Sequence, residues 1–265
     1  MSSDRMKQAI LVVSFGTSFN SSRSITIGAI ESTLAECFPE YTIRRAFTSK
    51  IIKAKLLKRD GIAIDNVEEA LEKLSEDGFK RVYIQPTHIM EGEEYDLTVE
   101  AAKPYMDKFE VLKVGHALLT EDRDLDALVD ALDEATKKES DEETARVFMG
   151  HGTEHNANAV YTKLQKKAEE KGFNDLFIGT VEATPSLDDI AEMVKRSGHK
   201  KIVLSPMMIV AGDHANNDMA GDDEDSWKSR FQRDGLEVRC RIRGLGNEYE
   251  IQKMIAKKCQ DLIEG

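Results

Sequence analysis

Short, mostly apolar runs alternate with segments of helical periodicity along the chain. The runs at residues 9–13, 81–84, 176–178 and 201–204 are typical of strands that are buried on both faces of a parallel sheet. Between such runs, apolar residues recur at helical spacing over residues 67–74 and 125–132. Ser186 and Asp189 form a capping-box pattern ahead of another helical segment. This alternation predicts βαβ units and therefore an α/β fold with parallel sheets flanked by helices.

The sequence also repeats itself once. Four residues of the first half recur in the second half at one constant offset: Gly78, Lys80, Pro86 and Gly92 match Gly198, Lys200, Pro206 and Gly212. A repeat of this length indicates a duplicated domain rather than a solenoid unit. We therefore predict two similar α/β lobes, an N-terminal one over residues 1–140 and a C-terminal one over residues 141–265, with the acidic stretch 137–144 as their junction. The active site is expected in the cleft between the lobes.

Ligands of open parallel sheets bind beyond the carboxyl ends of the strands, so the residues that follow the apolar runs are the candidates for chemistry. In the second half His151, Glu182 and His214 each follow a different predicted strand. Because the three loops lie at the same end of one sheet, we expect the three side chains to converge. Two imidazoles and a carboxylate suit a divalent first-row metal with open coordination positions. The repeat places Glu94 at the position that matches His214, which makes Glu94 a candidate proton acceptor from the other lobe.

The chain is acidic as a whole but contains one basic segment. The formal net charge is −12 and the sequence pI is about 5.1, which argues against binding to nucleic acid or to anionic membranes. The run 44–59 is nevertheless basic and free of acidic residues. Much of it fits the solvated face of a helix. Arg45, Thr48 and Ser49, however, are expected directly after the second strand of the first lobe, at the mouth of the cleft, where a guanidinium can bind ligand carboxylates. His88, after another strand, fits either packing or substrate contact.

The remaining signals concern location. The first residues are polar, the apolar run at 9–13 is too short for a signal-peptide core, and no stretch approaches the length of a membrane span. Cys37, Cys240 and Cys259 are odd in number and lack metal-ligand or redox spacing. These observations favour the cytoplasm.

Taken together, the motifs resemble those of the CbiK-type anaerobic cobaltochelatases. They occur in order through nearly the whole chain: Val12-Val-Ser-Phe-Gly-Thr-Ser18, Arg45-Ala-Phe-Thr-Ser49, His88-Ile-Met-Glu-Gly-Glu-Glu-Tyr95, Phe148-Met-Gly-His-Gly152, Val210-Ala-Gly-Asp-His-Ala-Asn-Asn-Asp-Met219, Asp225-Ser-Trp-Lys228 and Gly244-Leu-Gly246. The resemblance implies the bilobed chelatase fold. It also implies insertion of Co²⁺ into sirohydrochlorin during cobalamin biosynthesis, without ATP and without an organic cofactor.

The resemblance further implies roles for individual residues. His151 and His214 would bind the metal and accept pyrrole protons, Glu182 would be a carboxylate ligand of the metal, and Glu94 would handle metal or protons. The residues expected to bind the substrate are Arg45, Ser14, Thr17, Ser49 and His88. The carboxylates of sirohydrochlorin would give the basic region around Arg45 a purpose.

Three alternatives stay open at this point. A two-lobed carrier that binds a metal or a tetrapyrrole without turnover would have the same architecture. A metal-dependent hydrolase is a further possibility, although the sequence has no activated nucleophile, phosphate loop or second metal cluster to support it. Histidine and carboxylate ligands do not select Co²⁺ over Ni²⁺ or Fe²⁺ by affinity alone. A homo-oligomer is compatible with the sequence but is not indicated by it.

Overall fold

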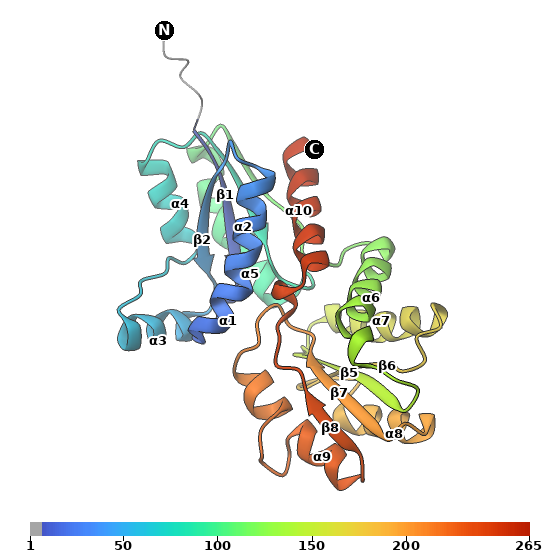
Figure 1. Cartoon of the computed structure of the whole chain (residues 1–265). Helices are drawn as coiled ribbons and strands as arrows, with labels where there is room; N and C mark the ends of the chain where they lie inside the picture. The colour runs from blue at the N-terminus through green and yellow to red at the C-terminus, as the bar shows by residue number, and fades with distance from the viewer. Residues whose placement is uncertain (1–6) are drawn as a thin grey trace. The chain divides into compact units, whose positions relative to one another are not determined.

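The computed structural model describes residues 7–265, and these residues form two compact units. One unit holds the chain up to Thr120 together with Gln252–Gly265, and the other holds Glu121–Ile251. Each unit contains its own sheet, as Figure 1 shows. Both sheets have four strands, and all their strand pairs are parallel. The α/β fold with two similar halves that the hydrophobic pattern predicted is confirmed.

The first unit is built on a sheet with the strand order β2-β1-β3-β4. Its strands are β1 (Gln8–Ser14), β2 (Thr42–Phe47), β3 (Arg81–Pro86) and β4 (Val111–Val114), and its helices are α1 (Asn20–Ile25), α2 (Ile27–Cys37), α3 (Lys50–Asp60), α4 (Val67–Glu76), α5 (Glu93–Ala102) and α10 (Tyr249–Glu264), with a 3-10 turn at Lys103–Lys108. Alternate residues of β1 pack against Leu71 and Leu74 of α4 in one hydrophobic core. The other residues of β1 are equally buried. Helix α2 is joined to α10 by a hydrogen bond from Thr33 Oγ1 to Gln252 Oε1.

The second unit has the strand order β6-β5-β7-β8, which is the same arrangement as in the first unit. Its strands are β5 (Thr144–Gly150), β6 (Leu176–Thr180), β7 (Lys201–Pro206) and β8 (Glu237–Cys240), its helices are α6 (Asp122–Thr136), α7 (Ala159–Glu170), α8 (Leu187–Ser197) and α9 (Trp227–Arg233), and its shorter turns are Lys137–Glu139, Asn156–Asn158, Ala215–Met219 and Leu245–Asn247. Helices α8 and α9 contribute Ile190 and Trp227 to one core with alternate residues of β5. The capping box predicted at the start of α8 is present, with Ser186 and Asp189 bonded reciprocally.

The sequence repeat has a direct structural counterpart. Gly78 and Gly198 follow α4 and α8 and have positive φ values of 77° and 81°, a left-handed conformation that glycine adopts without strain. Pro86 and Pro206 end β3 and β7. The repeated residues therefore mark the same helix–turn–strand unit in each half.

The compact units do not divide where the sequence predicted, between residues 140 and 141. Helix α6 groups with the second unit because it packs along α7, where Lys167 forms ion pairs with Asp122 and Asp126. Most of the C-terminal helix α10 groups with the first unit, in which Lys258 donates a hydrogen bond to Thr120. The first unit is therefore discontinuous in sequence, and a hydrophobic pattern alone does not reveal such a return of the chain.

None of the helices in the described part of the chain combines the length and the apolar character needed to cross a membrane.

Candidate metal centre

His151 stands directly after β5, at the carboxyl end of the second sheet. Its loop is fixed to the loop that follows β6, because the N–H of Glu182 donates to the carbonyl of His151 at 2.9 Å. The N–H of Val181 donates in the same way to the carbonyl of Gly150 at 3.0 Å, so the pairing of β5 and β6 continues beyond the strands. This extension brings the side chains of His151 and Glu182 together, with Nδ1 and Oε2 3.6 Å apart.

Gly152 allows the close approach of these two loops. Its φ is +86°, and a Cβ at this position would lie 2.9 Å from the backbone nitrogen of Ala183. The N–H of Gly152 also donates to the hydroxyl of Tyr161 at 3.3 Å. Tyr161 is buried in α7, and burial raises the pKa of its phenol, which keeps the hydroxyl neutral. Tyr161 thus holds the loop that carries His151 through this hydrogen bond. Tyr161 is a site residue that the sequence analysis missed, although its helical spacing with Leu164 is typical of a residue on the buried face of a helix.

His214 reaches the same place from the loop that follows β7. It precedes a π-helical turn, Ala215–Met219, whose first and last residues are fully buried in the core of the second unit. His214 Nδ1 lies 2.8 Å from Asp218 Oδ2 in this turn. The turn is therefore anchored on both sides while His214 itself stays partly exposed.

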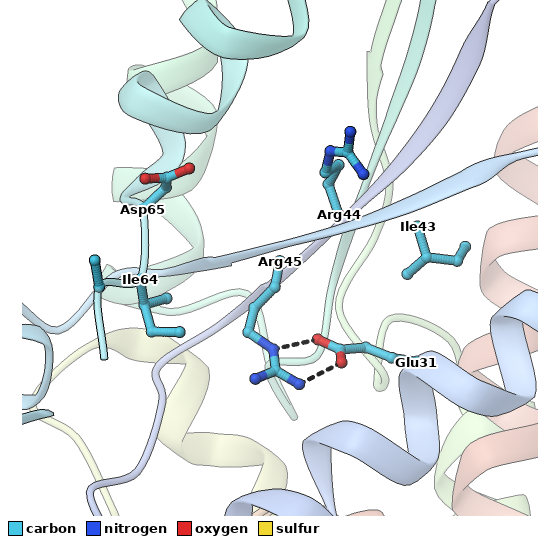
Figure 2. A pocket seen from close by; sticks show the side chains of 7 residues that line it. Glu31, Ile43, Arg44, Arg45, Ile64 and Asp65 are labelled. Carbon is cyan, nitrogen blue, oxygen red and sulfur yellow. Dashed lines mark hydrogen bonds and ion pairs between the residues drawn. The ribbon is translucent and has the colours of Figure 1, made fainter. Parts of the chain in front are cut away.

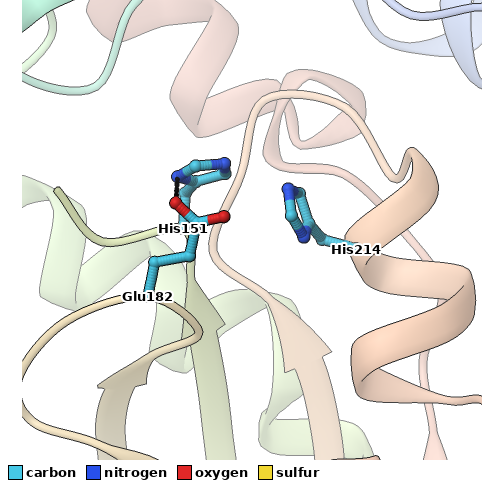
Figure 3. Close-up of side chains that lie close together, drawn as sticks. All are labelled: His151, Glu182 and His214. Atoms are coloured by element: carbon cyan, nitrogen blue, oxygen red, sulfur yellow. Dashed lines mark ion pairs between the residues drawn. The ribbon is translucent and has the colours of Figure 1, made fainter.

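The structure brings His151, Glu182 and His214 together, as Figure 3 shows. One ligand atom from each of the three side chains lies within 4.8 Å of the others, and the two imidazole rings meet edge to face with centroids 4.5 Å apart. His151 and Glu182 are about half exposed. A group of two imidazoles and a carboxylate that remains accessible to solvent could hold a divalent metal and leave coordination positions open.

Both imidazoles have the geometry to offer Nε2 to a metal. His151 Nδ1 lies 2.9 Å from the carbonyl oxygen of Gly152, and this oxygen can only accept, so Nδ1 must donate. His214 Nδ1 faces the carboxylate of Asp218 in the same manner. A neutral imidazole that donates through Nδ1 carries its lone pair on Nε2, which is then free to bind a cation.

Glu94 and His88 lie at the carboxyl end of the first sheet. Glu94 is in the first turn of α5, and its Oε2 is buried without a hydrogen-bond partner among residues 7–265. His88 follows β3, and neither of its ring nitrogens is accessible to solvent or has a hydrogen-bond partner in the part of the chain that the structure describes. Burial lowers the pKa of His88 to about 4. The cleft between the lobes and the placement of Glu94 opposite His214 stay predictions.

The other candidates for substrate binding have partners within the first unit. The guanidinium of Arg45 forms two hydrogen bonds with the carboxylate of Glu31 on α2, at 2.7 and 2.5 Å. The two residues line a pocket of about 350 Å³ together with Ile43, Arg44, Ala63, Ile64 and Asp65, shown in Figure 2. Arg45 lies within β2, not after it as expected, and its charge is balanced locally.

Three hydroxyl groups shape the loops at this end of the first sheet. Ser14 Oγ accepts a hydrogen bond from Thr87 Oγ1 at 2.8 Å, which links the ends of β1 and β3. Thr17 Oγ1 accepts from the N–H of Phe19, and Ser49 caps α3 by accepting from the N–H of Ile52. Ser14 and Thr17 are buried, so their clearest visible role is to hold the loops in place.

The fold of this chain is similar to that of a solved chelatase. A solved structure of the sirohydrochlorin chelatase SirB from Bacillus subtilis subspecies spizizenii, in complex with cobalt, matches 98% of this chain and 96% of its own at a TM-score of 0.63 and 12% identity. At that identity the likeness concerns the fold alone.

The sequence comparisons specify the family. The cobalt chelatase (CbiK) family model matches residues 8–264. A sirohydrochlorin cobaltochelatase of Salmonella typhimurium is 40% identical over 94% of each chain. The sirohydrochlorin cobaltochelatase CbiKC of Nitratidesulfovibrio vulgaris is 34% identical over 92% of this chain and 86% of its own. The chain therefore belongs to the CbiK family of cobalt chelatases.

Proposed function

We propose that this protein catalyses the insertion of Co²⁺ into sirohydrochlorin. The observation that carries the proposal is the convergence of His151, Glu182 and His214 at the strand ends of the second sheet. Family membership supports the same reaction, because relatives that match nearly the whole chain are named sirohydrochlorin cobaltochelatases. Co²⁺ is thus a substrate of the reaction, and the reaction requires neither ATP nor an organic cofactor.

The chemistry requires two exchanges at the centre of the macrocycle. The metal must exchange its ligands for pyrrole nitrogens, and two pyrrole N–H protons must leave. In our proposal Nε2 of His151 and Nε2 of His214 hold Co²⁺ together with the Glu182 carboxylate. The negative charge of Glu182 offsets part of the charge of the metal and so lowers the cost of removing its water ligands. Once the metal has entered the ring, each imidazole is free to accept a proton.

Glu94 is our candidate for a further proton acceptor or metal contact. Its buried Oε2 has no partner within the described chain, and such a group is costly unless a ligand or a proton satisfies it. The two buried ring nitrogens of His88 likewise have no hydrogen-bond partner within the described chain. We propose that both side chains face bound substrate. Ser14, Thr17 and Ser49 hold the surrounding loops. Arg45 stays our candidate for binding the carboxylates of the substrate, and this role would require its guanidinium to exchange Glu31 for a substrate carboxylate.

We further propose that the protein carries out this reaction in the cytoplasm. It needs no nucleic-acid or membrane partner. Self-association of the chain is compatible with the proposal but is not required by it.

Turnover distinguishes an enzyme from a carrier. Purified protein should be mixed anaerobically with Co²⁺ and an excess of sirohydrochlorin, and absorbance should follow the metallated product against an enzyme-free sample. We expect product to accumulate well beyond one equivalent of protein. A change that stops at one equivalent would assign the protein to carriers, and repeating the assay with Ni²⁺ and Fe²⁺ would rank its metals.

A further inference from the structure

Asp218 lies beside the group of His151, Glu182 and His214 and bonds to one of these proposed metal ligands without belonging to the group. Its Oδ2 lies 2.8 Å from His214 Nδ1, and the two residues are four positions apart across the π-helical turn Ala215–Met219. The contact is local, and it does not depend on the placement of any other element.

The turn gives this contact a defined geometry. The residues next to His214 and Asp218, Ala215 and Met219, are fully buried, so the backbone on which both side chains stand is fixed by the core. Asp218 itself is about half exposed and belongs to no buried cluster. Single π-helical turns are often found at functional sites, where they displace side chains from their regular helical positions.

His151 and His214 differ in the group that accepts a hydrogen bond from Nδ1 of the ring. Nδ1 of His151 is held by the backbone carbonyl of Gly152, which no substitution of a side chain removes. Nδ1 of His214 is held by a carboxylate, which a substitution can remove. A histidine that binds a metal through one ring nitrogen usually donates the other N–H to such a group, which fixes the tautomer and the orientation of the ring.

We propose that Asp218 is a positioning residue, which holds His214 in the tautomer and orientation that direct Nε2 to the incoming Co²⁺. This inference rests on the proposed function, since it assigns a role to His214 as a ligand of the substrate metal. Asp218 does not touch the metal or the macrocycle in this account. Its effect reaches the reaction through the imidazole alone.

The experiment compares Asp218→Ala, Asp218→Asn and Asp213→Ala in the full chain. Asp218→Ala removes the acceptor, and Asp218→Asn keeps an acceptor oxygen without the charge. Asp213→Ala removes an exposed carboxylate next to His214 that forms no hydrogen bond or ion pair within the described chain. We expect Asp218→Ala to raise the KM for Co²⁺ about 10-fold, with little change in the KM for sirohydrochlorin. Asp218→Asn should recover most of the loss, and Asp213→Ala should resemble the wild type.

A second readout uses the metal-free protein. Nitrogen-15 NMR of the His214 ring should show the proton on Nδ1 in the wild type and a mixture of tautomers in Asp218→Ala. An unchanged tautomer and KM in Asp218→Ala would overturn the proposal. Equal losses in Asp218→Ala and Asp218→Asn would also overturn it, since they would indicate a charge or a direct ligand. If Asp218→Ala fails to fold, Asp218→Leu, which also has no acceptor for Nδ1, takes its place in both measurements. The wild-type assay tests the proposed function separately, because a wild type that inserts no Co²⁺ would refute that function whatever the tautomer of His214.

Discussion

The imidazole rings of His151 and His214 meet at 90° with their centroids 4.5 Å apart, although 62 positions separate the two residues in the chain. They come from the ends of β5 and β7, which are neighbours in the second sheet. Because Nδ1 of each ring is engaged by an oxygen, both rings can present Nε2 to the same ion. The relationship depends on two loops that are each anchored by buried residues.

Replacing either histidine should abolish catalysis without unfolding the protein. Both side chains are partly exposed, so His151→Ala and His214→Ala remove no core packing. We expect the rate of Co²⁺ insertion to fall by about 10² to 10⁴-fold, while the circular dichroism spectrum and the binding of sirohydrochlorin are retained. His155→Ala, in the same loop as His151, is the matched control and should keep the wild-type rate. Near-normal rates in either active-site variant would contradict the proposed roles.

Glu182→Gln should raise the KM for Co²⁺ more than the KM for sirohydrochlorin. The carboxylate is about half exposed, so solvent screens its charge and the effect should be moderate. We expect the KM for Co²⁺ to rise several-fold, which corresponds to a loss of about 1 kcal/mol of binding free energy. The change in kcat should be smaller. Glu154→Gln removes the same charge from the neighbouring loop. If both variants gave the same KM for Co²⁺, Glu182 would act only through general electrostatics.

Gly152→Ala tests whether the approach of the two loops matters for the reaction. A left-handed backbone costs a non-glycine residue roughly 1 to 2 kcal/mol, and the added Cβ would also press against Ala183. Gly172→Ala is the control, since Gly172 has a similar φ of +83° but nothing within 4 Å of an added Cβ. We expect both variants to lower the unfolding temperature, and only Gly152→Ala to lower the insertion rate. Equal rates in the two variants would show that the loop contact is dispensable.

His88 predicts a pH dependence of stability. Burial lowers its pKa in the folded protein from 6.5 to about 4, so the unfolded chain binds a proton more readily than the folded one between these values. The stabilising contribution of neutral His88 is therefore complete above pH 6.5 and is lost as the pH falls toward about 4. Urea midpoints measured across this window should decline in the wild type and decline less in His88→Leu. His116→Gln, which removes an exposed histidine from the same unit, should follow the wild type.

The sequence predicted the sheets well because their signal is local. Short apolar runs and helical spacing identified β1, β3, β6 and β7 and helices α4, α6 and α8. The convergence of His151, Glu182 and His214 followed from a topological rule, since residues after parallel strands of one sheet share an edge. Their ligand atoms indeed lie within 4.8 Å of one another.

Other features depend on contacts between distant segments and were not accessible in this way. The pairing of Arg45 with Glu31 depends on the side from which α2 covers β2, which no periodicity specifies. The return of α10 to the first unit is a contact of the same kind. The support of Gly152 by Tyr161 spans only nine positions, but it depends on how α7 packs against the loop that follows β5. The role of Asp218 needed the π-helical turn, because spacing alone does not show that its carboxylate meets Nδ1 of His214.

X-ray absorption of the Co²⁺-loaded protein tests whether His151 and His214 bind the metal, because it reports the ligands of the metal itself. The wild type should show scattering from two imidazoles with additional oxygen ligands, and the His151→Ala/His214→Ala double variant should lose the imidazole contribution. A wild-type spectrum without imidazole scattering, or one that the double variant leaves unchanged, would contradict the assignment of His151 and His214 as the residues that hold Co²⁺.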